Sequence, residues 1–122
     1  IRWGVDATLA DFMLEVFPCA QFIVNTRRDL DRQLASQDDA FGGHPDAKRL
    51  EKATRMLETW QSSHDRHARL IHLEDFGLDL FDQLLQWLNV TDCRFKAMAH
   101  ANYGEFAAPH KKTLTEGTCG RA

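Results

Sequence analysis

The sequence is poor in the residues and runs that define several protein classes. It has three cysteines in 122 residues, and none of them forms a Cys-x-x-Cys pair. An odd, widely spaced set of cysteines does not suit a disulfide framework. We therefore expect three thiols in a reducing compartment, with a Cys93–Cys119 bridge as the alternative. No apolar run approaches the length needed to cross a bilayer, which predicts a soluble chain without a transmembrane segment.

A strong excess of one charge is also missing. The formal net charge is −3, and acidic and basic residues are interspersed along the chain. This balance lacks the basic field of a nucleic-acid-binding protein, so no nucleic-acid partner is expected. The start, Ile1-Arg2-Trp3-Gly4, has no initiator methionine and does not read as the apolar region of a signal peptide. It predicts a processed product or a piece of a longer chain.

What is present is an alternation of helical and strand-like patterns. Short apolar runs at 20–25 and 68–73 predict strands buried on both faces. Helices are expected at 8–17, 29–36, 45–64 and 78–88. Because helices connect the two strands, the order predicts a helix-rich α/β piece with a parallel sheet. The apolar face of the first helix has the spacing i, i+3, i+4, i+7 and i+8, and consists of Leu9, Phe12, Met13, Val16 and Phe17.

Local signals set the expected boundaries of these elements. Asp29 is a suitable N-cap for the second helix, and Pro45 is expected in the first turn of the third. Residues 37–46 read as a loop, as does the tail from Pro109. We expect one domain portion at 1–106 and an extended tail at 107–122. Two strands make a poor sheet, so further strands are expected from elsewhere in the parent protein or from a partner.

The most informative motif is an arginine after the first strand and a serine eight residues later. Ligands of open α/β sheets bind beyond the carboxyl ends of the strands. Arg28 is expected at that end, and Ser36 about two turns into the following helix. A planar guanidinium and a hydroxyl are good donors for a phosphate. The alternative is that Arg28 forms an ion pair with Asp29, Asp31 or Glu74 and ties the strand end to a loop.

This Arg–Ser pair resembles the second nucleotide motif of the nucleotide-dependent sulfotransferases. The block 69–76 is similar to the family's strand ending in aromatic-Glu-Asp, 85–90 is similar to the helix end that follows, and 1–4 looks like a "WGFKE" start. The resemblance covers roughly residues 1–106. It implies the C-terminal part of a P-loop-like sulfotransferase fold. In such a fold Arg28 and Ser36 would hold the 3′-phosphate of 3′-phosphoadenosine 5′-phosphosulfate or of adenosine 3′,5′-bisphosphate.

The chain departs from this family where the chemistry takes place. It has no glycine-rich lysine loop to bind the 5′-phosphosulfate, and no catalytic residue can be assigned. Asp6-Ala7 replaces the family's Lys-Glu, and Leu73 replaces the aromatic residue that packs on adenine. A degenerate or truncated member, inactive as an isolated chain, is therefore expected. The alternative is a non-catalytic structural or interaction subunit that binds another protein chain or the missing N-terminal part of its own parent.

The histidines raise the question of a metal site. His64 and His67 stand three residues apart, with His72 nearby, and Asp65 or Glu74 would be the further ligands. Nothing in the spacing fixes those further ligands, which a zinc site requires. Surface histidines and no bound metal are therefore expected.

Overall fold

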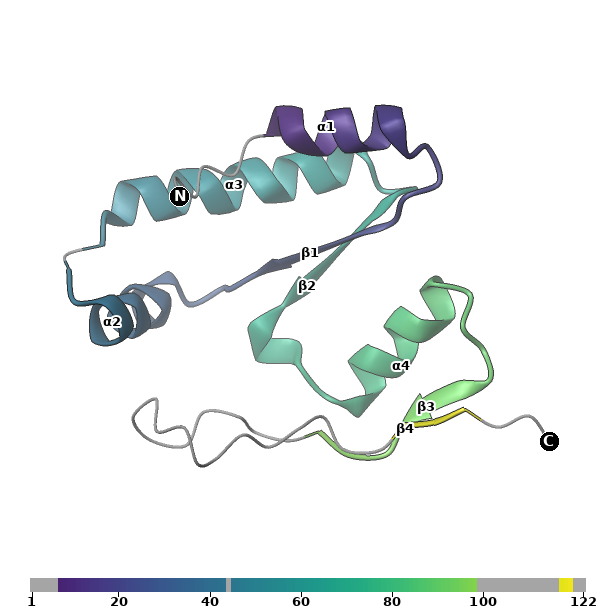
Figure 1. Ribbon diagram of the computed structural model, residues 1–122. Helices are drawn as coiled ribbons and strands as arrows, with labels where there is room; N and C mark the ends of the chain where they lie inside the picture. The colour runs from purple at the N-terminus through teal and green to yellow at the C-terminus, as the bar shows by residue number, and fades with distance from the viewer. Residues whose placement is uncertain (1–6, 44, 99–116, 120–122) are drawn as a thin grey trace. The chain divides into compact units, whose positions relative to one another are not determined.

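The computed structural model describes residues 7–43, 45–98 and 117–119 (Figure 1). The chain divides into two compact units, Ile1–Glu74 and Asp75–Ala122. The first holds α1 (Ala7–Val16), β1 (Phe22–Thr26), α2 (Leu30–Phe41), α3 (Ala47–Ser63) and β2 (Ala68–His72). A 3₁₀ turn, η1 (Leu73–Asp75), follows β2. The second unit holds α4 (Leu78–Trp87), β3 (Cys93–Phe95) and β4 (Gly117–Cys119).

The two predicted strands pair with each other in parallel. The register runs from Phe22 opposite Ala68 to Thr26 opposite His72. Helices α2 and α3 form the crossover between them, as a parallel connection requires. The mixed α/β class and the parallel pairing are therefore confirmed. Among the described residues this sheet has two strands, β1 and β2.

The core of the first unit lies on one face of these strands. Val24, Trp60 and Ala68 form a buried cluster, and α1 and α3 lie on the same side of β1 and β2 (Figure 1). Along β1 burial alternates: Val24 is buried, whereas Ile23 is 44% exposed. The expectation that β1 is buried on both faces is therefore wrong, because helices of this unit cover one face.

Helix α1 confirms the predicted helix, but its larger apolar face points outward. Ala10 and Leu14 pack against the core, and Asp11 accepts a hydrogen bond of 2.8 Å from Trp60 Nε1. These contacts fix the side of α1 that meets α3. The large apolar side chains on the remaining surface are between 39% and 61% exposed. We call this set the α1 stripe; it consists of Leu9, Phe12, Met13, Val16 and Phe17.

Helix α2 begins as predicted but is longer. The Asp29 carboxylate caps it by accepting the N–H of Arg32 at 2.9 Å. The loop expected at 37–46 is wrong for residues 37–41, which continue the helix. Gly42 ends it in the left-handed conformation, with φ 58°, which costs glycine little because it has no Cβ.

Helix α3 is capped by Asp46, whose carboxylate accepts the N–H groups of Lys48 and Arg49. Pro45 therefore precedes the helix instead of lying in its first turn. The Asp46 carboxylate thereby satisfies two of the N–H groups that the first turn of a helix leaves without an intrahelical partner.

The second unit contains a helix and a short hairpin-like pair. Helix α4 confirms the predicted helix, and its Leu84 is buried. Phe81 makes edge-to-face contacts with Phe76 and Phe95. The Asp82 carboxylate accepts the N–H of Phe95 at 3.1 Å, which fixes β3 against α4.

Two expectations about the C-terminal part are corrected. Strands β3 and β4 pair antiparallel, so the tail is not loop at 117–119. Their register places the Cα atoms of Cys93 and Cys119 opposite each other, and Cys93 is disulfide-bonded. Three free thiols are therefore wrong: Cys19 is free and exposed, and Cys93 is not. Three cysteines spread along a sequence do not reveal which strands bring two of them together.

Candidate functional site

The carboxyl ends of β1 and β2 carry the polar residues of the candidate site. Thr26 and His72 end the two strands opposite each other. Arg28 and Glu74 each follow two residues later. Glu74 Oε2 accepts the N–H of Arg28 at 3.1 Å, and Oε1 accepts the N–H of Asp29 at 3.2 Å. The carboxylate therefore joins the end of β2 to the point where α2 begins.

The Glu74 carboxylate also attracts the Arg27 guanidinium. Arg27 Nε lies 3.6 Å from Glu74 Oε1, and the two side chains are 21% and 29% exposed. Partial desolvation, the largest single influence, raises the pKa of Glu74. The N–H groups of Arg28, Glu74 and Asp29 and the charge of Arg27 outweigh it, so the pKa lies below the ordinary 4.5. Glu74 is therefore an anion at neutral pH, held by backbone donors and a cation.

The predicted phosphate pair occupies the same end of the sheet. Arg28 lies two residues after the end of β1 and is exposed, and Ser36 is exposed on α2, about two turns from its start. Both residues are where the sequence predicts them along the chain. That their side chains meet one phosphate stays a prediction. The alternative, an ion pair of the Arg28 side chain with Asp29, Asp31 or Glu74, also stays a prediction: Glu74 binds the backbone N–H of Arg28 and pairs with Arg27.

A second polar cluster lies just inside the strand ends. Thr26, which is buried, donates its hydroxyl to Glu58 Oε1 at 3.0 Å and lies 3.0 Å from His72 Nδ1. A hydroxyl has one hydrogen, so while Thr26 donates to Glu58 the imidazole Nδ1–H must donate to Thr26. The cluster joins β1, β2 and α3 through side chains.

Sequence reasoning missed this cluster. Thr26 has the same strand parity as the buried Val24, which is a signal that its side chain points toward the helices. Glu58 gives no comparable signal, because the face of α3 that meets the sheet is set by tertiary packing.

The histidines do not gather at one place. His64 Nδ1 lies 2.8 Å from the Trp60 carbonyl oxygen, and His64 Nε2 lies 3.5 Å from Asp11. His72 is the last residue of β2, whereas His64 precedes the start of that strand. In residues 7–43 and 45–98, no three histidine, cysteine or acidic side chains form a group that could hold a metal ion. The same residues contain no helix long and apolar enough to span a membrane.

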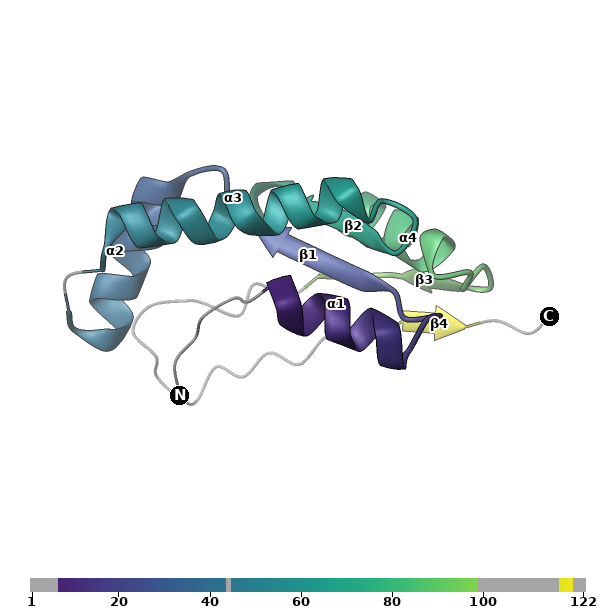
Figure 2. The same ribbon diagram turned by 90° about the horizontal axis from the view of Figure 1, so that it is seen from above.

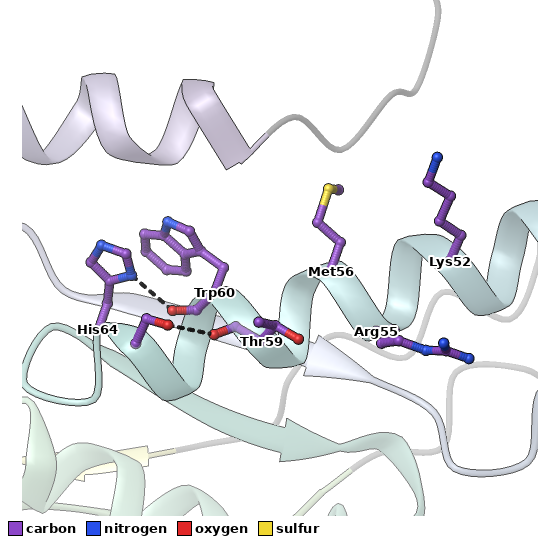
Figure 3. A pocket seen from close by; sticks show the side chains of 7 residues that line it. Lys52, Arg55, Met56, Thr59, Trp60 and His64 are labelled. Carbon is purple, nitrogen blue, oxygen red and sulfur yellow. Dashed lines mark hydrogen bonds between the residues drawn. The ribbon is translucent and has the colours of Figure 1, made fainter.

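An open hollow of about 430 Å³ lies along one side of α3. Met56 and Lys52 project from the same side of the helix as Trp60, which stacks on His64 at 4.4 Å (Figure 3). Neither Arg28 nor Ser36 lines it, so it is separate from the strand-end site. All of its lining residues belong to α3 or its C-cap: Lys52, Arg55, Met56, Thr59, Trp60, Ser63 and His64.

Comparison with known proteins identifies no relative. No family model matches the chain, and neither a curated protein nor a solved structure matches it. The sulfotransferase resemblance is therefore a hypothesis that rests on the motif residues alone.

Proposed function

We propose that this chain is a non-catalytic interaction subunit, built from a sulfotransferase-like α/β piece that binds another polypeptide. The observation that supports it is the α1 stripe. Four large apolar side chains of a ten-residue helix, together with Phe17 directly after it, are 39–61% exposed. A contiguous apolar patch on a protein surface is typical of an interaction site. Exposure of these apolar side chains to water is unfavourable, and a partner that buried them would stabilise the complex.

The charges of α1 indicate what kind of partner fits. Helix α1 carries two charged residues, Asp11 and Glu15, and both are acidic. Two copies of α1 packed together would bring like charges close, which is unfavourable. Asp11 is already held by Trp60 and His64, so a partner helix with an apolar face and basic flanks would pair a lysine or arginine with Glu15. We therefore commit to such a partner over a homodimer.

The absence of sulfate transfer is part of this proposal. Sulfuryl transfer needs donors aimed at the leaving phosphate and a base near the acceptor hydroxyl. The sequence contains no glycine-rich loop with a lysine to supply those donors. Contacts to a 3′-phosphate would position a cofactor without touching the reacting bond.

Two measurements on residues 1–122 test this function. Light scattering after size exclusion reports the oligomeric state, and an assay with labelled 3′-phosphoadenosine 5′-phosphosulfate reports turnover. We expect no turnover. Association, where it occurs, should be lost in Phe12→Gln/Val16→Gln. Leu73→Gln is the control, because Leu73 is 41% exposed outside the stripe. Measurable turnover by a well-behaved monomer would overturn the proposal.

A second candidate function is binding of a phosphate group by Arg28 and Ser36, as in adenosine 3′,5′-bisphosphate. The observation that favours it is the position of Arg28, two residues after β1 and just before the N-cap of α2. The carboxyl end of a parallel strand next to a helix start is the usual location of such sites.

Calorimetry with adenosine 3′,5′-bisphosphate tests this second candidate. Arg28→Ala should weaken binding at least tenfold, because a guanidinium contact is charge-assisted, and Ser36→Ala should weaken it less. Arg66→Ala is the matched control: it removes the same charge just before β2, at the other end of the sheet. Equal binding by Arg28→Ala and Arg66→Ala would rule this site out.

A further inference from the structure

The donors at the end of β1 already hold an anion, and that anion is the protein's own Glu74. Two consecutive backbone N–H groups, of Arg28 and Asp29, point to the two carboxylate oxygens at 3.1 and 3.2 Å. The Arg27 guanidinium lies beside them, with its Nε 3.6 Å from Oε1. Successive N–H groups next to a cation are the donor set that binds phosphate and sulfate groups.

The N–H groups that bind the Glu74 carboxylate do not belong to the first turn of α2. Asp29 is the N-cap of α2, and its own side chain accepts the N–H of Arg32. The N–H groups that hold Glu74 therefore belong to the strand end and the cap. Arg27 Nε is buried and has no hydrogen-bond partner at hydrogen-bonding distance. A guanidinium nitrogen in this position gains from a larger or closer oxyanion.

We propose that residues 27–29 form an anion site for a phosphate or sulfate group, and that Glu74 fills it as a built-in competitor. An external anion must displace the carboxylate, so the intact chain should bind such groups weakly. The inference goes beyond the proposed interaction role. It shares the anion chemistry of the second candidate but uses Arg27 and backbone N–H groups, not the Arg28 and Ser36 side chains.

The test is a titration of the full chain with inorganic phosphate, in which the NMR amide resonances of residues 28 and 29 report binding. Glu74→Ala vacates the donors and should bind phosphate at least tenfold more tightly than the unmodified chain. Glu74→Gln removes the charge but keeps one oxygen acceptor, so its affinity for phosphate should lie between those of Glu74→Ala and the unmodified chain. Glu51→Gln is the control, because it removes the same charge from an exposed position on α3, and it should leave the affinity unchanged.

The gain should disappear in Arg27→Ala/Glu74→Ala. A parallel titration with adenosine 3′,5′-bisphosphate shows whether a nucleotide phosphate binds better than the free ion. If Glu74→Ala does not fold, Glu74→Gln decides the question. Affinity that stays equal or falls when Glu74 is replaced in a folded chain overturns the proposal. A gain that needs Arg27 but not Arg28 upholds it and distinguishes this site from the Arg28–Ser36 site.

Discussion

Thr26 and Glu74 form side-chain hydrogen bonds where β1 and β2 end. Glu74 satisfies two backbone N–H groups that leave the strand, and Thr26 connects Glu58 with His72. Buried polar groups are costly unless they are hydrogen-bonded. The two residues therefore determine how the parallel pair ends, before any ligand is considered.

Replacing Thr26 with valine should destabilise the first unit. Valine has a similar shape and suits a strand, but it removes the hydroxyl that bridges Glu58 and His72. We expect the free energy of unfolding in urea to fall by about 1–2 kcal/mol. Thr26→Ser, which keeps the hydroxyl, should lose less than Thr26→Val. A valine variant as stable as the original would show that the cluster contributes nothing to the fold.

Glu74 also predicts a pH dependence. Its pKa in the folded chain is lowered from 4.5, so its contribution to stability is complete above about pH 4.5 and is lost as the pH falls through the lower folded value. The protection of the amides of residues 28 and 29, measured relative to their intrinsic exchange rates, should therefore fall on acidification, with a midpoint below 4.5. Glu74→Gln should remove this transition. A transition of the same midpoint in the variant would assign it to another group.

Among the helices, α1 shows what periodicity predicts and what it does not. The spacing of Leu9, Phe12 and Val16 correctly predicts a helix and identifies its apolar face. It does not say what that face meets. In the structure the narrower side, with Ala10 and Leu14, meets the core, because Asp11 reaches Trp60 Nε1 and draws that side toward α3. The tertiary contacts of Ala10, Leu14 and Asp11 therefore set the orientation of α1, and periodicity does not predict them.

The sequence predicts the site at the ends of β1 and β2 to a similar extent. Strand patterns placed Arg28 and Glu74 near each other, since parallel strands end at the same edge. That Glu74 would bind the backbone at Arg28 and pair with Arg27 depends on the register, which a sequence does not state. The extension of α2 to Phe41 was missed because Asp38 and Asp39 read as loop residues, whereas Gly42 sets the end.

Across the chain, the two units differ in how far the sequence specified them. The elements of the first unit follow from hydrophobic patterns. The pairing of β3 with β4 joins residues more than 20 positions apart, and each strand has only three residues. Such short strands carry no periodic signal, so the sequence does not decide between a free Cys93 thiol and the Cys93 disulfide of the structure.

The central claim is that the α1 stripe binds a partner with an apolar face and basic flanks. The most direct measurement is the affinity of residues 1–122 for two labelled helical peptides that share one apolar face, one flanked by lysines and the other by glutamates. We predict that the chain binds the lysine-flanked peptide at least tenfold more tightly. Phe12→Gln/Val16→Gln should lose that binding, and Leu73→Gln should keep it. Equal affinity for the two peptides, or binding unaffected by the stripe variant, would contradict the account.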